Sequence, residues 1–264
     1  MKILTAFRNW SVPYRLPRWS DVKQVKTLDR ETEREVLQNI LAQARSDWAL
    51  AAARGIEEDK KSTIRALGET LTDPKPLPFT AYRTEAEALA DCATPRYAGL
   101  LLAGVVTTVQ PSKLIEIGAA HGYGAAYIGE ALRRLGTDGH LATFEGMIAR
   151  CRMTREALGR MHLEQWVELI EGNFDHTINH YLEENQPIDF MFSDGDKDPD
   201  RTWAQFQLGL GAMADGGHMF FDDINFNDPI SRVWREIVAQ ARVTSCATFL
   251  DRWGLLTVSA ETGS

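Results

Sequence analysis

Cysteine is scarce in this sequence, and its three copies are too few to build a disulfide framework or a zinc site. Cys92, Cys151 and Cys246 lie far apart in the chain, which is typical of small buried side chains in a reducing compartment. The sequence also lacks a long apolar run, so we expect neither a signal peptide nor a membrane span. These absences predict a cytoplasmic protein with no membrane partner.

Positive charge is in short supply as well. The 29 lysines and arginines are outnumbered by 37 acidic residues, which gives a formal net charge of −8. No basic block offsets this acidity, so we expect no nucleic acid partner. The length of 264 residues, with 44% hydrophobic and 25% charged residues, is typical of one large globular domain with an extension.

The most informative segment is residues 113–130, with the sequence KLIEIGAAHGYGAAYIGE. A short apolar strand leads there into a glycine-rich turn and then a helix, which is how doubly wound α/β proteins bind nucleotides. The turn follows the order E-x-G-x-x-x-G-x-G, whereas a dinucleotide site has G-x-G-x-x-G/A. Read from Gly122, however, the segment departs from the dinucleotide pattern only at its last position. The motif alone therefore leaves NAD binding open.

From residue 113 onward, strand and helix patterns alternate. We expect strands over 113–117, 140–144, 167–170, 188–193 and 217–221, and helices over 123–135, 147–160, 175–184, 200–213 and 228–240. Strands separated by helices need crossovers, so these strands form a parallel sheet with helices on both faces.

Two further strands, 243–249 and 253–259, are separated by only about three residues and must form an antiparallel hairpin. We therefore expect a doubly wound, Rossmann-like α/β fold with a seven-stranded, mostly parallel sheet and an antiparallel last strand.

Helical patterns also precede this alternation. Residues 1–28 carry no clear period and are expected to form an irregular arm. The capping-box signature Thr32-x-x-Glu35 predicts a helix that ends near Gly55, and a second helix is expected over about 57–72.

The proline-rich segment TDPKPLPF, residues 72–79, predicts a linker. Thr84-x-x-Glu87 predicts another helix start, and Pro95 opens an apolar, buried helix over 96–109. Residues 1–90 are thus expected to form an arm and a helical extension that caps the site or forms a homodimer interface. Residues 91–264 are expected to form the ligand-binding domain.

Polar residues follow the strands at the edge of the sheet where such folds bind ligands. Glu145 follows one strand and can accept hydrogen bonds from ribose hydroxyls, which S-adenosylmethionine and NAD both carry. Asn173 and Phe174 follow the next strand, where an adenine ring can stack, although Phe174 could equally belong to the core. His121 faces the same ligand by its position in the glycine turn.

Three carboxylates follow two other strands. Asp194 comes after the strand 188–193, and Asp222 and Asp223 come after the strand 217–221. Such a cluster without a cation would raise the pKa values of its members by repulsion, and Mg²⁺ or Ca²⁺ bound through oxygens would relieve it. The alternative is that these residues are helix N-caps and loop acids.

The region from about Tyr97 to Ser259 resembles the cation-dependent catechol/caffeoyl-CoA O-methyltransferase group of the class I S-adenosylmethionine-dependent methyltransferases. The segments that carry the resemblance are IEIGAAHGYGAA, the acid of ATFEG, DGDK after IDFMFS, and GGHMFFDD. A parallel sheet with one reversed strand is also the topology of that class. One position departs from the group, because Asp223 stands where the group has asparagine, which alters the charge of the metal site.

The resemblance implies metal binding by Asp194, Asp222 and Asp223, and catalysis by Lys197 as the base together with Asp194. It implies that S-adenosylmethionine binds at Glu116, Gly118, Ala120, His121, Tyr123, Gly124, Glu145, Gly146, Asn173, Phe174 and Asp194. The expected reaction is methylation of a hydroxyl group on a small molecule, assisted by a divalent cation. Alternatives are a metal-independent methyltransferase for a sugar, natural product or protein, and a non-catalytic or NAD-binding protein.

Overall fold

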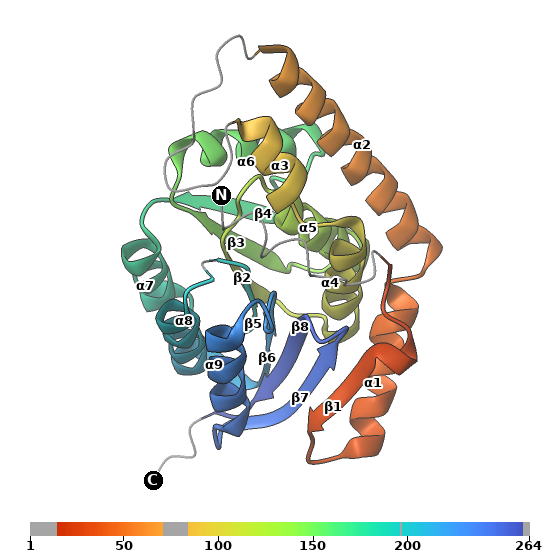
Figure 1. Cartoon of the computed structure of the whole chain (residues 1–264), viewed down its shortest axis with the longest axis vertical. Helices are drawn as coiled ribbons and strands as arrows, with labels where there is room; N and C mark the ends of the chain where they lie inside the picture. Colours follow the sequence, from red (N-terminus) through yellow and green to blue (C-terminus); the bar gives the residue numbers. More distant parts are fainter. Residues whose placement is uncertain (1–14, 71–83, 196, 261–264) are drawn as a thin grey trace.

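The computed structural model describes residues 15–70, 84–195 and 197–260. At its centre is an eight-stranded sheet in the order β1-β7-β8-β6-β5-β2-β3-β4 (Figure 1). The mutually parallel strands from the alternating region are β2 (Lys113–Ile117), β3 (His140–Glu145), β4 (Val167–Glu171), β5 (Ile188–Ser193) and β6 (Met213–Phe221). The predicted hairpin is formed by β7 (Val243–Phe249) and β8 (Trp253–Val258), and β8 lies between β6 and β7, antiparallel to both.

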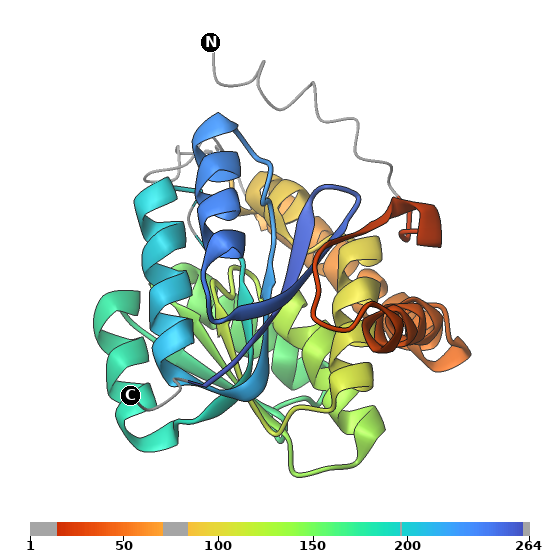
Figure 2. The ribbon, with the colours of Figure 1, turned by 90° about the horizontal axis from the view of Figure 1, so that it is seen from below.

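Helices cover both faces of this sheet, as the alternating pattern predicted (Figure 2). One face carries α4 (Arg96–Val109), α5 (Tyr123–Leu135) and α6 (Ile148–Arg160). The other carries α7 (Phe174–Asn185), α8 (Pro199–Ala212) and α9 (Asp228–Ala239). Each face has its own apolar core, so the doubly wound α/β prediction is confirmed. Within the described residues, every helix is too short or too polar to cross a bilayer.

The sheet has one strand more than the sequence predicted. Residues Val22–Lys26, expected to belong to an irregular arm, form the edge strand β1, which pairs antiparallel with β7. A five-residue edge strand carries too little hydrophobic pattern to be predicted from its own sequence. It is recognised from the strand with which it pairs, and here that strand lies far away in the sequence. The sheet therefore ends in β1, and two of its strands, β1 and β8, run against the parallel set.

The N-terminal helices begin and end at different residues from those predicted. Helix α1 (Arg30–Gln43) is capped by Asp29, which accepts backbone hydrogen bonds from Glu31 and Thr32, so the predicted cap at Thr32 is wrong. Helix α2 (Asp47–Thr70) runs through Gly55, which was expected to end a helix. The predicted cap at Thr84 is confirmed for α3 (Glu85–Cys92). The predicted linker over 72–79 lies outside the described residues.

Helices α1 and α2 form an outer layer on α4 and α5 (Figure 1). The apolar stripe Leu37, Ile40 and Leu41 of α1 is buried in the same core as α4. Helix α2 also bonds to α5 through polar groups, since the Tyr123 hydroxyl donates to Asp59 Oδ2 at 2.9 Å. The described part of the N-terminal extension therefore shares a core with the sheet domain.

Two helical glycines provide a matched test of this packing. A Cβ at Gly104 of α4 would lie 2.5 Å from the carbonyl oxygen of Ile40, whereas a Cβ at Gly55 of α2 would meet nothing within 4 Å. We expect Gly104→Ala to destabilise the fold by about 1–3 kcal/mol through overpacking. Gly55→Ala should stabilise it by about 0.5–1 kcal/mol because alanine favours the helix. Urea unfolding measures the change in the free energy of unfolding for each variant. If both substitutions stabilise the fold, or both destabilise it, the close approach of α1 and α4 is contradicted.

Candidate functional site

The glycine turn joins β2 to α5 at the carboxyl edge of the sheet. Gly118 has φ +98°, and a Cβ there would lie 2.6 Å from the carbonyl oxygen of Asp194. The turn therefore lies so close to the backbone of Asp194 that only glycine fits at this position. Gly122, with φ +82°, is the N-cap of α5. The first N–H groups of α5 have no partner within the helix, which makes this turn suited to a polar ligand.

Glu145, at the end of β3, holds this turn in place. Its side chain is only 4% exposed. Its Oε2 accepts a hydrogen bond from the Ala120 N–H, and its Oε1 accepts one from the Met147 N–H, each at 2.8 Å. Each carboxylate oxygen can accept a further hydrogen bond. Gly146 follows directly and adds no side chain beside the carboxylate.

Glu116 lies beneath the turn and is 1% exposed. Burial raises its pKa to about 8, although a hydrogen bond from the Thr143 hydroxyl opposes that shift. A Cβ at Gly124 would collide with the Glu116 carboxyl group, so the missing side chain leaves room for this acid. The structure thus places Glu116 as an internal support of the turn, and its predicted direct contact with a cofactor stays a prediction.

The remaining predicted cofactor residues have different environments. The Tyr123 side chain bonds to Asp59 of α2, so it points away from the carboxyl edge of the sheet, and only its backbone remains available there. His121 is buried within the turn. Asn173 is exposed just before α7. Phe174 packs partly against the core, which agrees with the alternative that it is a core residue.

The three predicted metal ligands come together with Lys197. The backbone N–H of Asp194 donates to Ile117 and that of Asp222 donates to Ser193, which extends the strand ladders to the acidic residues. Lys197 Nζ lies 2.9 Å from Asp194 Oδ1 and 3.1 Å from Asp223 Oδ2. Asp196, between Asp194 and Lys197 in the sequence, lies outside the described residues.

Arg252 completes this cluster, and the sequence interpretation missed it. Its Nε lies 2.9 Å from Asp222 Oδ1 and 3.1 Å from Asp223 Oδ1. The register pairs Phe221 with Gly254, which brings the start of β8 beside the residues that follow β6. The predicted hairpin was the available signal, since it reverses the chain just before β8. The order of β6, β7 and β8 in the sheet was not predictable from local patterns.

The charges of this cluster act on one another. Burial outweighs the Lys197 charge and raises the pKa of Asp194. Burial and the neighbouring Asp222 raise the pKa of Asp223 to about 7. For Asp222, burial is outweighed by the charges of Arg252 and Lys197, which lower its pKa. Although burial opposes it, the surrounding aspartates raise the pKa of Lys197 far above its ordinary value, so this side chain is an ammonium group.

The donor set does not fit a divalent cation as it stands. Both oxygens of Asp222 face the Arg252 guanidinium, and the two oxygens of Asp223 face Arg252 and Lys197. A dication between these carboxylates would have to displace two side chains that already carry positive charge. Among the described residues, no group of three or more histidine, cysteine or carboxylate side chains is arranged to hold a metal ion.

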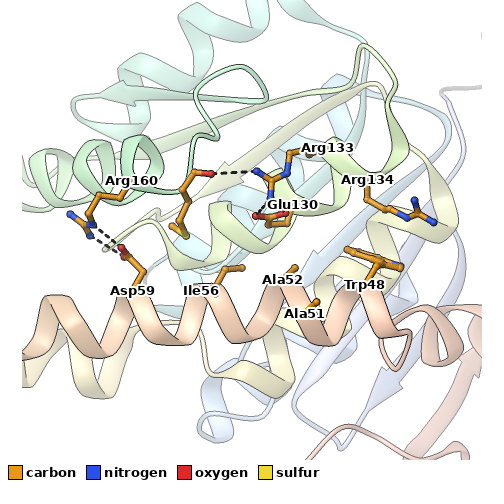
Figure 3. A pocket seen from close by; sticks show the side chains of 11 residues that line it. Trp48, Ala51, Ala52, Ile56, Asp59, Glu130, Arg133, Arg134 and Arg160 are labelled. Carbon is orange, nitrogen blue, oxygen red and sulfur yellow. Dashed lines mark hydrogen bonds and ion pairs between the residues drawn. The ribbon is translucent and has the colours of Figure 1, made fainter.

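A separate hollow of about 720 Å³ lies between α2 and the C-terminal ends of α5 and α6 (Figure 3). Trp48 and Ala52 of α2 face Arg134 of α5 across it. Arg160 is held there by Asp59, with Nε 2.7 Å from Oδ1. The α5 residues that line the hollow lie in the second half of that helix, away from the glycine turn, although Asp59 also binds the Tyr123 hydroxyl at the start of α5. None of the residues of the acidic cluster lines it.

Comparison with known families gives one match, which covers residues 115–224 and is described as a methyltransferase domain. This range runs from β2 to just after Asp223 and so contains the glycine turn and the acidic cluster. A search of curated protein sequences finds no significant match.

Several solved structures share the fold. An O-methyltransferase from Bacillus cereus in complex with SAH is 21% identical, with a TM-score of 0.55, covering 71% of this chain and 94% of that one. An O-methyltransferase from Streptomyces achromogenes involved in tomaymycin synthesis, in complex with SAM, is 20% identical, with a TM-score of 0.53 and coverage of 66% and 85%. An SAH-bound methyltransferase from Podospora anserina is 16% identical, with a TM-score of 0.60 and coverage of 90% and 99%. The predicted class I methyltransferase fold is confirmed.

The buried Glu116 carboxyl group predicts a pH dependence of stability. Its pKa is about 8 in the fold and 4.5 ordinarily, so its contribution to stability is complete below pH 4.5 and is lost as the pH rises towards 8. Glu116→Gln keeps the bond to Thr143 but does not titrate. Between pH 5 and 8 the free energy of unfolding of the native chain should fall relative to this variant, by up to about 1.4 kcal/mol per pH unit.

Urea unfolding of both proteins across this pH range measures the difference. Parallel pH profiles would show that Glu116 is ionised in the folded protein and would contradict its placement.

Proposed function

We propose that the chain methylates a hydroxyl group of a small molecule with S-adenosylmethionine as the donor, since residues 115–224 match a methyltransferase domain model. The observation that carries the proposal is the convergence of three features at one edge of the sheet. These are the glycine turn before α5, Glu145 at the neighbouring strand end, and the Asp194–Lys197 pair at the strand end on the other side.

The cofactor is proposed to lie along the glycine turn. Gly118 and Gly122 leave its backbone open, and the start of α5 offers N–H groups to the methionine part of the ligand. Glu145 is proposed to accept hydrogen bonds from the ribose hydroxyls, beside Gly146. Asn173 and Phe174, which follow β4, are proposed to border the adenine ring. Support also comes from the SAH and SAM present in the similar structures.

Methyl transfer asks little of the protein beyond position, because the sulfonium methyl group is already a strong electrophile. The acceptor oxygen must be held in line and carry negative charge. The base role expected for Lys197 needs a neutral amine, but Lys197 lies between Asp194 and Asp223 as an ammonium group. We therefore propose that Lys197 donates a hydrogen bond to the acceptor oxygen, which lets a phenolic hydroxyl lose its proton to solvent and stabilises the oxyanion. The oxyanion then bonds to the methyl carbon as the carbon–sulfur bond breaks and S-adenosylhomocysteine leaves.

Residues 1–90 are proposed to shape the acceptor pocket and to contribute to a homodimer, in the cytoplasm. Helices α1 and α2 bury apolar residues against α4 and α5, so their removal would expose the core of the domain itself. Truncation is thus a poor test of this role. The mass of the full chain in solution, measured by light scattering, is expected to be twice that of the monomer.

The proposed activity is tested with labelled S-adenosylmethionine and a panel of catechols, simple phenols and sugars. We expect transfer of the label to at least one phenolic hydroxyl, and much slower transfer by Lys197→Met at unchanged cofactor affinity. Labelling of protein in a cell extract with no labelling of any small molecule would favour the protein-acceptor alternative. Cofactor binding without any transfer would favour the non-catalytic one.

A single substitution tests the cofactor site. Glu145→Ala should weaken S-adenosylmethionine binding by about 1–3 kcal/mol, since a charged acceptor for the ribose hydroxyls is lost. Glu168→Gln on β4 is a suitable control, because Glu168 is exposed on the neighbouring strand and should leave the affinity unchanged. Isothermal titration calorimetry measures both. Equal affinity in Glu145→Ala and the native chain would contradict the ribose assignment.

A further inference from the structure

The guanidinium group of Arg252 is held on several sides within the acidic cluster. Its Nε and Nη2 atoms donate to the two oxygens of Asp222 at 2.9 and 3.2 Å, which is the bidentate arrangement that arginine favours with carboxylates. Its Nη1 lies 3.5 Å from the Tyr97 hydroxyl, and its central carbon lies 4.9 Å from the ring centroid of Trp253. The side chain is only 15% exposed.

The backbone fixes the same residue. Leu250 and Asp251, in the three-residue connection between β7 and β8, have φ of +55° and +54°, the left-handed values that both central residues of a type I′ turn adopt. The Arg252 N–H closes this turn by donating to the Phe249 carbonyl at 3.1 Å. The Arg252 carbonyl accepts from the Ile224 N–H at 2.9 Å, which ties the hairpin to the loop after β6. Arg252 therefore cannot leave the cluster by a simple movement of a free loop.

Lys197 supplies the second positive charge, on the other side of Asp223. Its ammonium group contacts Asp194 and Asp223 at 2.9 and 3.1 Å. All three carboxylates that the sequence suggests as metal ligands are thus engaged by side-chain cations. Three buried carboxyl groups thus face two positive side chains, and burial makes that compensation necessary, since an unpaired charge in the interior is costly.

We propose that Arg252, together with Lys197, takes the place that a divalent cation holds in metal-assisted O-methyltransferases, so that this site works without a metal. The catalytic meaning of this inference rests on the proposed function, whereas its metal-binding consequence does not. A fixed guanidinium neutralises the aspartates without offering open coordination positions. An acceptor with a single hydroxyl then suffices, because there is no metal for a vicinal pair to chelate.

The test is a titration of the purified chain with Mn²⁺, followed by electron paramagnetic resonance, and it needs no knowledge of the acceptor. We compare the native chain with Arg252→Met, which removes the charge but keeps much of the side-chain volume. Arg232→Met is the matched control, since Arg232 is an exposed arginine on α9. The double variant Arg252→Met/Asp222→Ala shows whether any gained binding uses the cluster.

We expect no saturable Mn²⁺ binding by the native chain or Arg232→Met in the micromolar range, and a new saturable site in Arg252→Met that the second substitution abolishes. Micromolar binding by the native chain that Asp222→Ala removes would overturn the proposal. A folded Arg252→Met that gains no site would overturn it too. If Arg252→Met does not fold, the native chain and Arg252→Lys decide: both must fail to bind Mn²⁺, and binding by either contradicts the proposal.

S-adenosylmethionine binding is measured on the same samples by calorimetry. If the native chain does not bind S-adenosylmethionine, the proposed function is contradicted, and the result on Mn²⁺ binding is unaffected. The two failures are therefore distinguishable.

Discussion

Compensation of buried negative charge is the constraint on which this site depends. Acidic side chains stand at or just after the carboxyl ends of neighbouring parallel strands, and each has a specific partner. Glu145 accepts backbone N–H groups from two loops, and Asp222 is held by Arg252. Glu116 is accommodated differently, since burial raises its pKa and favours the neutral form. Removing one partner from a buried ion pair typically destabilises a protein by about 3–5 kcal/mol, so these contacts also hold the loops in shape.

The hairpin of β7 and β8 links this electrostatic arrangement to the topology of the sheet. Because β8 lies antiparallel beside β6, its first residues reach the edge where the parallel strands end. The first residues of the reversed strand therefore place the Arg252 cation at the site. A parallel strand in the same position would begin at the opposite edge of the sheet. In this chain the feature that distinguishes the sheet from a fully parallel one also supplies Arg252, and the two properties need to be considered together.

Much of the fold was predictable because local signals agreed with one another. The alternation of apolar strands and helices predicted the parallel strands and the hairpin close to their observed bounds, except that β6 begins at Met213 and not at residue 217, and the glycine turn indicated the candidate site. Long-range pairing was not predictable. Residues Val22–Lys26 form a strand only because β7 offers an edge, and Gly55 stays helical because α2 continues on both sides. The acids of the cluster were identifiable from their places after strands, but their partner Arg252 depended on the strand order.

The glycine turn and Glu145 are proposed to bind S-adenosylmethionine and not a dinucleotide. Calorimetric titration of the full chain with S-adenosylhomocysteine and, separately, with NAD distinguishes the two ligands. Saturable binding of S-adenosylhomocysteine at a single site per chain, with no heat from NAD, is the predicted result. Binding of NAD in its place, or binding of neither ligand, would contradict the account.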